Sequence, residues 1–334
     1  MAKIGVLGAG TWGMALSRML SNSGHDITVW SALENEVTQY ASTRRHPNLP
    51  GMIIPDEIGF TGDIGRAASG KDILLFAVPS VFVRSTARAA APYTAEGQII
   101  VDVAKGIEPD TLLTLTEVIH EEMEKAGKTS VKMVALSGPT HAEEVALDLP
   151  STIVSASEDP QAAEYVQDIC MNTCMRVYTN SDVKGVELCG AMKNIIALAS
   201  GICLGLGYGD NTKAALMTRG MAEITRLGLA MGCRPQTFYG LAGIGDLIVT
   251  ATSVHSRNNR AGYLIGQGKT PEEAKKEVGM VVEGINALPA AMSLSRQYQV
   301  EMPICTGVND IISCGASARD IVRGLMERPK KAES

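Results

Sequence analysis

The spacing of hydrophobic and polar positions changes near the middle of the chain. In the first half, short apolar runs alternate with stretches of helical spacing such as WGMALSRMLSNSG; the runs are KIGVLG, DITVW, DILLFAV, QIIVDV, VKMVALSG and STIVSA. Apolar runs separated by helices are typical of a mostly parallel sheet that helices cover on both faces. We therefore predict an α/β domain of the Rossmann type over residues 1–180.

The second half has helical spacing throughout. Helices are predicted over residues 183–206, 212–232, 271–277, 284–298 and 308–314. Turn-forming residues cluster in YTNSDVKG, which places the domain boundary there. We therefore predict an all-α domain over residues 181–334, ending in a polar tail.

A glycine-rich turn lies between the first predicted strand and the first predicted helix. In this position GxGxxG allows a tight turn, a close approach of a pyrophosphate to the backbone, and close packing of helix on strand. The helix N-terminus adds N–H groups and a partial positive charge for the phosphates. The turn therefore predicts dinucleotide binding, through Gly8, Gly10, Thr11, Trp12 and Gly13.

The residues after the second predicted strand leave the choice of dinucleotide open. An NAD site usually has an acid at the end of this strand. Here Ser31 and Ala32 stand at that position, and the nearest acid in sequence is Glu34. No arginine follows directly to hold a 2′-phosphate, since Arg44 and Arg45 are distant in sequence. NAD(H) and NADP(H) both remain possible.

Composition and charge narrow the classes of protein. The 334 residues carry a net charge of −6, which argues against a nucleic-acid binder and means that an anionic ligand needs a local group of donors. Seven scattered cysteines suit free thiols in a reducing compartment. The longest apolar run contains a lysine and several glycines, so no stable membrane insertion is expected. We expect a cytoplasmic protein.

That lysine, Lys193, is the only charged residue between Glu187 and Asp210. The small and apolar residues around it predict a helix packed in a core. Burial disfavours a charged ammonium, so such a lysine needs a partner or a chemical task. Two interpretations remain open: a proton donor and acceptor, or a structural lysine that pairs with a buried acid or reaches water.

Four further motifs carry polar groups at the ends of predicted elements. Lys105 in VDVAKGIE follows a strand, so it is expected to face the crevice where an open sheet binds its ligands. LSGPTHAEEV is also a strand end, where Gly138 and Thr140 can offer hydrogen-bond donors. Asp246 lies between glycine turns and an apolar run in LAGIGDLIVT and can orient a buried lysine. The donors of TSVHSRNNRAG suit a phosphate. Taken singly, each motif is also compatible with an ordinary solvated loop or turn.

Together, the motifs resemble those of the bacterial-type NAD(P)-dependent glycerol-3-phosphate dehydrogenase family. The matching order is GAGTWG, AKGIE, SGPTHAEEV, GAMKN, GIGDL and SRN, and HPNLPG, GDNTKAALMTRG and LMERPKK extend the resemblance over nearly the whole chain. The resemblance implies reversible reduction of dihydroxyacetone phosphate, a phosphorylated triose, to sn-glycerol 3-phosphate with NAD(H) or NADP(H). It also implies a role in supplying the glycerol backbone of phospholipids, and a homodimer.

The resemblance also implies a role for particular residues. The expected catalytic groups are Lys193, Lys105 and Asp246. The expected substrate contacts are these three with Gly138, Thr140, Ser256, Arg257 and Asn258. The expected cofactor contacts are the glycine turn with Lys105, Ala142, Arg257, Val281 and Glu283. Two positions depart from the family: His141 replaces a common phenylalanine, and no basic residue ends the second strand.

Two other functions fit part of the pattern. Ketopantoate reductase and hydroxyacid dehydrogenases also combine a Rossmann-type domain with a helical one. A dinucleotide sensor without catalytic activity would need the glycine turn but not Lys193, Asp246 and the SRN donors together. The SRN segment after GIGDL favours the phosphorylated triose.

Overall fold

The computed structural model describes residues 1–330, 332 and 333. The chain forms two compact units, Met1–Glu187 and residues 188 onward. The division falls inside helix α8 (Val183–Gly205), whereas the sequence predicts a boundary after residue 180. One continuous helix therefore contributes residues to both units.

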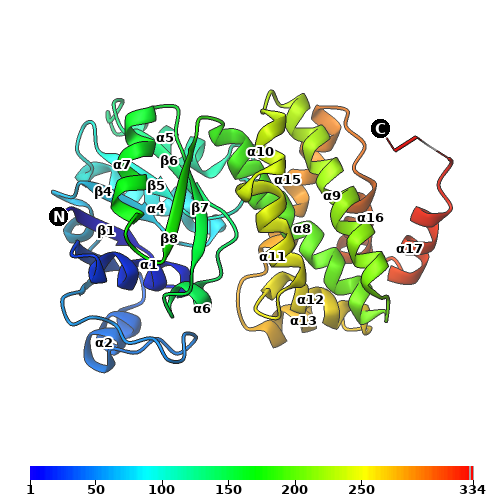
Figure 1. Ribbon diagram of the computed structural model, residues 1–334, viewed down its shortest axis with the longest axis horizontal. Helices are drawn as coiled ribbons and strands as arrows, with labels where there is room; N and C mark the ends of the chain where they lie inside the picture. Colours follow the sequence, from blue (N-terminus) through cyan, green and yellow to red (C-terminus); the bar gives the residue numbers. More distant parts are fainter. Residues whose placement is uncertain (331, 334) are drawn as a thin grey trace. The chain divides into compact units, whose positions relative to one another are not determined.

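The first unit is built on one eight-stranded sheet in the order β3-β2-β1-β4-β5-β6-β7-β8 (Figure 1). The strands are β1 (Lys3–Leu7), β2 (Asp26–Trp30), β3 (Gly59–Thr61), β4 (Ile73–Phe76), β5 (Ile99–Asp102), β6 (Lys132–Ser137), β7 (Ser151–Ala156) and β8 (Met175–Asn180). Neighbouring strands are parallel except β6 and β7, which are antiparallel. The predicted, mostly parallel Rossmann-type sheet is confirmed.

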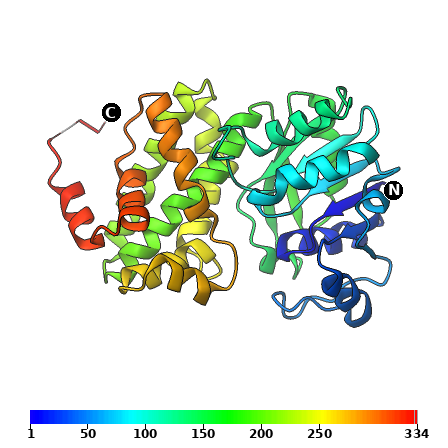
Figure 2. The same ribbon diagram turned by 180° about the vertical axis from the view of Figure 1, so that it is seen from behind.

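Helices cover both faces of this sheet, which Figures 1 and 2 view from opposite sides. One core cluster joins the sheet to α1 (Thr11–Asn22) and α7 (Pro160–Cys170). The other joins it to α4 (Val83–Ala90) and α5 (Leu115–Lys125). Burial on both faces explains why a central strand such as β4 reads ILLF with no polar alternation. The remaining helices of this unit are α2 (Glu34–Thr43), α3 (Ile64–Ala68) and α6 (Ala142–Val145), with short 3-10 turns over Ser80–Phe82 and Ala91–Tyr93.

Two strands and one strand direction were not predicted. Strand β3 has only three residues, and β8 lies at the sheet edge with Arg176 and Tyr178 exposed, so neither gives a continuous apolar run. Between β6 and β7 the chain has only the four-residue helix α6. A parallel crossover needs a connection of about a dozen residues or more, usually with a longer helix, and β7 instead runs antiparallel.

The second unit is helical, as predicted. Besides α8 it contains α9 (Asp210–Ala230), α10 (Pro235–Tyr239), α11 (Asp246–Thr252), α12 (Arg257–Gly266), α13 (Pro271–Val278), α14 (Glu283–Asn286), α15 (Leu288–Gln297), α16 (Pro303–Cys314) and α17 (Ala318–Met326). The single helix predicted over residues 284–298 is wrong, because α14 ends before α15 begins. Pro289 lies in the first turn of α15, where its missing N–H costs no helical hydrogen bond.

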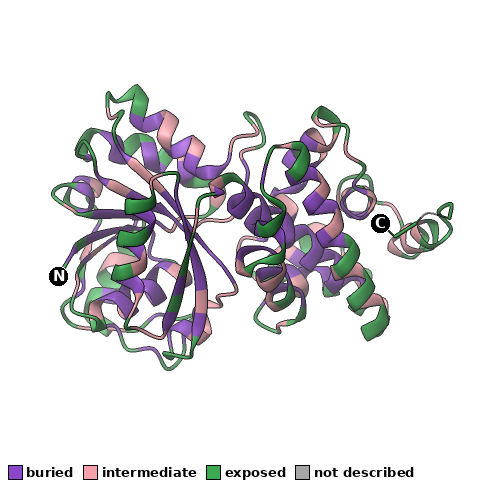
Figure 3. Cartoon of the chain, turned by 45° about the horizontal axis from the view of Figure 1, so that its top comes forward, coloured by how far each residue is buried: buried purple, intermediate pink, exposed green. Residues whose placement is uncertain are grey.

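Helix α8 is the core of this unit, and Figure 3 shows the inner helices coloured as buried. It is long and apolar enough to cross a membrane, but 89% of its most apolar window is buried inside the protein, as in a core helix. It packs backbone to backbone against α12. A Cβ on Gly201 would lie 2.0 Å from the Asn259 carbonyl oxygen, and one on Gly262 would lie 2.1 Å from that of Leu198. Glycines thus allow the second half of α8 and helix α12 to meet closely.

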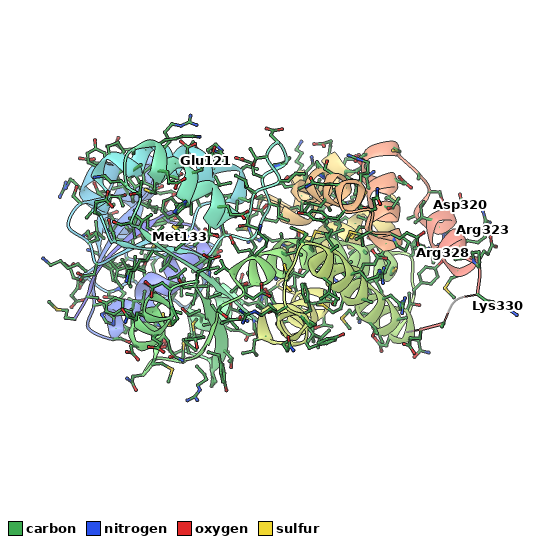
Figure 4. All side chains as sticks on the ribbon, turned by 90° about the horizontal axis from the view of Figure 1, so that it is seen from above. Glu121, Met133, Asp320, Arg323, Arg328 and Lys330 are labelled. Carbon is green, nitrogen blue, oxygen red and sulfur yellow. The ribbon has the colours of Figure 1, made fainter. Side chains whose placement is uncertain are left out.

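The final helix, α17, has no buried residue. Asp320 and Arg323 form an ion pair of 2.6 Å on it, and Figure 4 shows both side chains on this helix near the C-terminus. The sequence prediction contained no helix at this position. The helix adds polar surface to the second unit.

Candidate functional site

The glycine turn has the geometry that a pyrophosphate requires. Gly8 has a φ of +121°, and a Cβ there would lie 2.7 Å from the Ala77 carbonyl. A Cβ on Gly13 would lie 2.3 Å from the Gly8 oxygen, so this glycine packs the helix on the strand. Gly10 caps α1, and a Cβ there would meet no atom within 4 Å. The space beside the first N–H groups of α1 is therefore open, and no acidic residue lies in the first turn.

The turn is fixed to the end of β2. The Gly8 N–H donates to the Trp30 carbonyl at 2.9 Å. Ser31 follows β2, and its hydroxyl donates to a carboxylate oxygen of Glu36 at 2.6 Å. Glu34, the nearest acid in sequence, is exposed. Glu36 is the acid at this strand end because α2 begins at Glu34 and carries residue 36 back towards Ser31.

Lys105 and the SGPT segment lie together in the first unit. The Lys105 ammonium and the Thr140 hydroxyl both donate to the Gly138 carbonyl, each at 3.2 Å. Gly138 acts here through its carbonyl oxygen as an acceptor, whereas a donor was predicted. His141 takes the N-cap position of α6 with extended backbone, and Ala142, the first residue of that helix, is buried. The strand ends thus assemble a lysine, a hydroxyl and a helix start.

The second unit contains a buried ion pair. The side chains of Lys193 and Asp246 are 6% and 1% exposed, and the Lys193 Nζ lies 2.6 Å from Asp246 Oδ1. Nζ also donates to the Thr250 hydroxyl at 2.5 Å, and that hydroxyl donates to the Asp246 carbonyl at 2.7 Å. The carboxylate favours the charged ammonium, which burial alone would disfavour. Thr250 was not predicted, although its place four residues after Asp246 on one helix puts both on the same face.

An unusual helix segment positions Asp246. Leu241–Gly245 is a π-helix that leads directly into α11, where glycine turns were predicted. A Cβ on Gly243 would lie 2.1 Å from the Phe238 carbonyl oxygen, so a side chain there is incompatible with this path. Short π-helical segments occur frequently at functional sites.

Asn194, beside Lys193, connects three motifs. The Asn258 amide donates to the Asn194 side-chain oxygen at 3.0 Å, and the Gly284 N–H donates to the Asn258 oxygen at 2.8 Å. These contacts join α8, α12 and the start of α14, where Val281 is half-buried and Glu283 is the first helical residue. The GAMKN, SRN and VVEG motifs are therefore neighbours in space. Asn194 itself was not singled out from the sequence.

The SRN motif forms the start of α12. Ser256 is the N-cap, and its hydroxyl accepts from the Asn259 N–H at 3.2 Å. Ser256 and Asn258 are buried and hydrogen-bonded within the protein, whereas Arg257 is exposed. An exposed guanidinium beside the N–H groups of a helix start is a suitable arrangement for an anion.

The first unit is of the Rossmann type and has an open glycine turn, and the helical unit has a buried lysine–aspartate pair. These features are typical of dehydrogenases that use a nicotinamide dinucleotide. Residues 3–163 and 182–323 match the N- and C-terminal models of NAD-dependent glycerol-3-phosphate dehydrogenase. The chain is 70% identical, over 100% of its length and 99% of the relative, to glycerol-3-phosphate dehydrogenase [NAD(P)+] 2 of Lactobacillus delbrueckii subsp. bulgaricus. It is 51% identical to the glycerol-3-phosphate dehydrogenase [NAD(P)+] of Agathobacter rectalis, over 100% of this chain and 98% of the relative.

A solved structure agrees with these matches. The crystal structure of glycerol-3-phosphate dehydrogenase from Coxiella burnetii superposes with a TM-score of 0.93 at 33% identity, covering 98% of this chain and 99% of that one. The chain belongs to the NAD-dependent glycerol-3-phosphate dehydrogenase family.

Proposed function

We propose that this protein reversibly reduces dihydroxyacetone phosphate to sn-glycerol 3-phosphate with NADH or NADPH. The observation that carries the proposal is the buried pair of Lys193 and Asp246, in a chain related to these dehydrogenases over its full length. We further propose that it works as a cytoplasmic homodimer and supplies the glycerol backbone of phospholipids.

The nucleotide is assigned to the glycine turn. When bound, its nicotinamide supplies a hydride to the carbonyl carbon, or accepts one in the reverse direction. The N–H groups at the start of α1 hold the pyrophosphate, and the open space at Gly10 admits it. The proposed contacts are Gly8, Gly10, Thr11, Trp12 and Gly13, with Lys105, Ala142, Arg257, Val281 and Glu283.

Proton transfer is assigned to Lys193. During reduction, negative charge grows on the carbonyl oxygen, and the ammonium stabilises that charge and donates its proton. Asp246 keeps the ammonium charged before reaction, and Thr250 fixes its direction. In the oxidation direction the neutral amine takes the hydroxyl proton. Lys105, held by the Gly138 carbonyl, adds positive charge for the substrate.

The substrate phosphate is assigned to the start of α12. Because the protein has a net charge of −6, the donors must be local, and Arg257 with the first N–H groups of α12 supplies them. Ser256 and Asn258 shape this start, while Gly138 and Thr140 complete the proposed substrate contacts. Binding energy from the phosphate then aligns the carbonyl for reaction.

Initial rates with different substrates test the proposal. NADH and NADPH consumption is measured with dihydroxyacetone phosphate, ketopantoate and 3-oxo acids. We expect kcat/KM for the phosphorylated triose to exceed that for the others by at least about 100-fold, because a site built for a phosphate is left with unpaired donors by ligands that lack one. Comparable or better turnover of ketopantoate would contradict the proposal. Nucleotide binding without turnover of any substrate would instead support a sensor.

A further inference from the structure

Two buried side chains at the carboxyl ends of neighbouring strands each have a polar atom without a hydrogen-bond partner. These atoms are Asp102 Oδ2 at the end of β5 and the Ser137 hydroxyl oxygen at the end of β6. The two residues are 2% and 6% exposed. An unpaired polar atom in a protein interior costs free energy, so nearly all such atoms bond to protein or water. Both atoms therefore require a partner, and no residue in the described part of the chain provides one.

The two side chains lie on the same face of the sheet. Neighbouring residues of a strand point to opposite faces. Val101 packs in the core cluster on the α1 and α7 side, so Asp102 points to the α4 and α5 side. Leu136 packs in the same cluster as Val101, so Ser137 also points to the α4 and α5 side. Ile100, two residues before Asp102, confirms this face, because it packs in the other core cluster.

The strand register brings the two side chains close enough for one water molecule to reach both. Asp102 pairs with Ala135 on the parallel strand β6, so Ser137 lies two residues further along. A strand spacing of about 4.8 Å and a rise of about 3.3 Å per residue put the Asp102 and Ser137 Cα atoms about 8 Å apart. The two side chains span part of that distance. A water molecule, with hydrogen bonds of about 2.8 Å on either side, can join their polar atoms.

These two strand ends also carry the contact that holds Lys105. The Lys105 ammonium donates to the Gly138 carbonyl at 3.2 Å, and Gly138 directly follows Ser137. Lys105 lies three residues after Asp102, whose Oδ1 accepts from the Ala104 N–H at 3.2 Å. The path from β5 to Lys105 and the path from β6 to Gly138 therefore begin at the two side chains with unpaired polar atoms.

The chain around this contact is tightly packed at other points. The Val103 N–H donates to the Phe76 carbonyl at 3.1 Å, which continues the sheet past Asp102. A Cβ on Gly106 would lie 2.5 Å from the Ser80 Cβ, so the segment is close-packed again one residue after Lys105. Between these two points, the Asp102 side chain holds the backbone through its bond to the Ala104 N–H.

We propose that Asp102 and Ser137 bind one buried water molecule and thereby position Lys105 for the substrate. The inference rests on the proposed dehydrogenase activity and adds two positioning residues to it. Burial, and then the charge of Glu187, raise the pKa of Asp102 and favour a proton on its carboxyl group. The protonated carboxyl group donates to the water, and the water donates to the Ser137 hydroxyl oxygen.

A crystal structure of the full-length protein at atomic resolution tests the water site directly, whatever reaction the protein catalyses. We expect one ordered water molecule within hydrogen-bond distance of both Asp102 Oδ2 and the Ser137 hydroxyl oxygen. A direct hydrogen bond between the two side chains, or a space between them that holds no water, would overturn the proposal.

A double-variant cycle on kcat/KM for dihydroxyacetone phosphate tests the positioning role. The variants are Ser137→Ala, Lys105→Ala and their combination. We expect Ser137→Ala to lower kcat/KM about fivefold to tenfold when Lys105 is present, and less than about twofold in the Lys105→Ala protein. Equal effects in the two backgrounds would overturn the positioning role. The control is Ser155→Ala, which should change kcat/KM less than about twofold, because the buried Ser155 hydroxyl already donates to the Ala163 carbonyl at 2.9 Å.

Variants of Asp102 separate hydrogen bonding from packing. Asp102→Asn keeps an N–H donor for the water and an oxygen for the Ala104 N–H, so kcat/KM should stay within about threefold of the wild type. Asp102→Leu removes both bonds and should lower kcat/KM at least as far as Ser137→Ala. An equal loss in Asp102→Asn and Asp102→Leu would contradict the hydrogen-bonding role. If Asp102→Leu does not fold, the Ser137→Ala cycle decides the question.

The proposed reaction and the proposed water site can fail separately. An ordered water between Asp102 and Ser137 in a protein that does not reduce dihydroxyacetone phosphate would contradict the reaction and leave the water site standing. Reduction of that substrate, with Ser137→Ala equally harmful with and without Lys105, would contradict only the positioning role.

Discussion

At the scale of single residues, the sequence predicts which groups are unusual better than it predicts their partners. Lys193 is isolated among apolar residues, so its burial follows from the pattern, and Asp246 was named as an acid able to orient it. Nothing in the sequence marks Thr250 as a partner of Lys193, because a threonine in an apolar run has no distinctive pattern around it. Glu36 was not singled out from the sequence, since residue type alone does not show which carboxylate turns back towards a strand.

The buried pair predicts a characteristic pattern of stability. Replacing either Lys193 or Asp246 alone leaves an unpaired buried charge and should lower the free energy of unfolding by about 3–5 kcal/mol. The double variant Lys193→Met/Asp246→Leu fills the space with apolar groups and should recover most of that loss, without activity. Urea unfolding of the two single variants and the double variant measures this. A double variant that loses the sum of the single effects would show that the pair itself stabilises the fold.

At the scale of elements, local patterns predict helices and central strands, while long-range packing decides the remaining details. The apolar runs of β1 and β4–β7 are enough to predict these strands. Contacts with residues far along the chain decide the edge strand β8, the π-helix before α11 and the antiparallel direction of β7. Packing also brings two buried acids to the ends of elements in the first unit. Asp102 ends β5, and Glu187 lies near the start of α8.

These two acids carry different hydrogen bonds. Glu187 accepts from the Thr116 N–H at 2.9 Å and from the Thr116 hydroxyl at 2.5 Å. Asp102 accepts from the Ala104 N–H at 3.2 Å, while its Oδ2 has no hydrogen-bond partner among the described residues. Burial, and then the charge of Glu187, raise the pKa of Asp102 well above its ordinary value, and burial raises that of Glu187 to about 6. Burial therefore favours the protonated form of Asp102 in the folded protein.

The raised pKa of Asp102 predicts how stability changes with pH. The folded protein holds a proton that the unfolded chain releases, so this contribution is fully present below the unfolded pKa and is lost as pH rises through the folded pKa. Asp102→Asn mimics the protonated acid. Its free energy of unfolding should therefore rise relative to that of the wild type with increasing pH, by at most about 1.4 kcal/mol per pH unit. Urea unfolding between about pH 5 and pH 8 measures the difference, and a pH-independent difference would contradict the assignment.

At the scale of the whole molecule, the division of tasks follows the division of the chain. The first unit has the glycine turn and Glu36, and the second has the buried lysine, its aspartate and the start of α12, which we propose as the phosphate site. Several motifs could be placed from the sequence because they fall at the ends of recognisable elements, whereas Lys193 lies in the interior of α8. The net charge of −6 predicts only that an anionic ligand needs local hydrogen-bond donors. It does not show which side chains these are, because packing sets the direction of each side chain.

The most direct test of the central claim is kcat with dihydroxyacetone phosphate for Lys193→Met, measured together with the NADH dissociation constant. The exposed lysine variant Lys276→Met serves as the control. We predict that Lys193→Met lowers kcat by about 100- to 10,000-fold, while NADH affinity stays within about twofold of the wild type and the control is unchanged. A Lys193→Met protein that folds, binds NADH and turns over at close to the wild-type rate would contradict the assignment of proton transfer to Lys193.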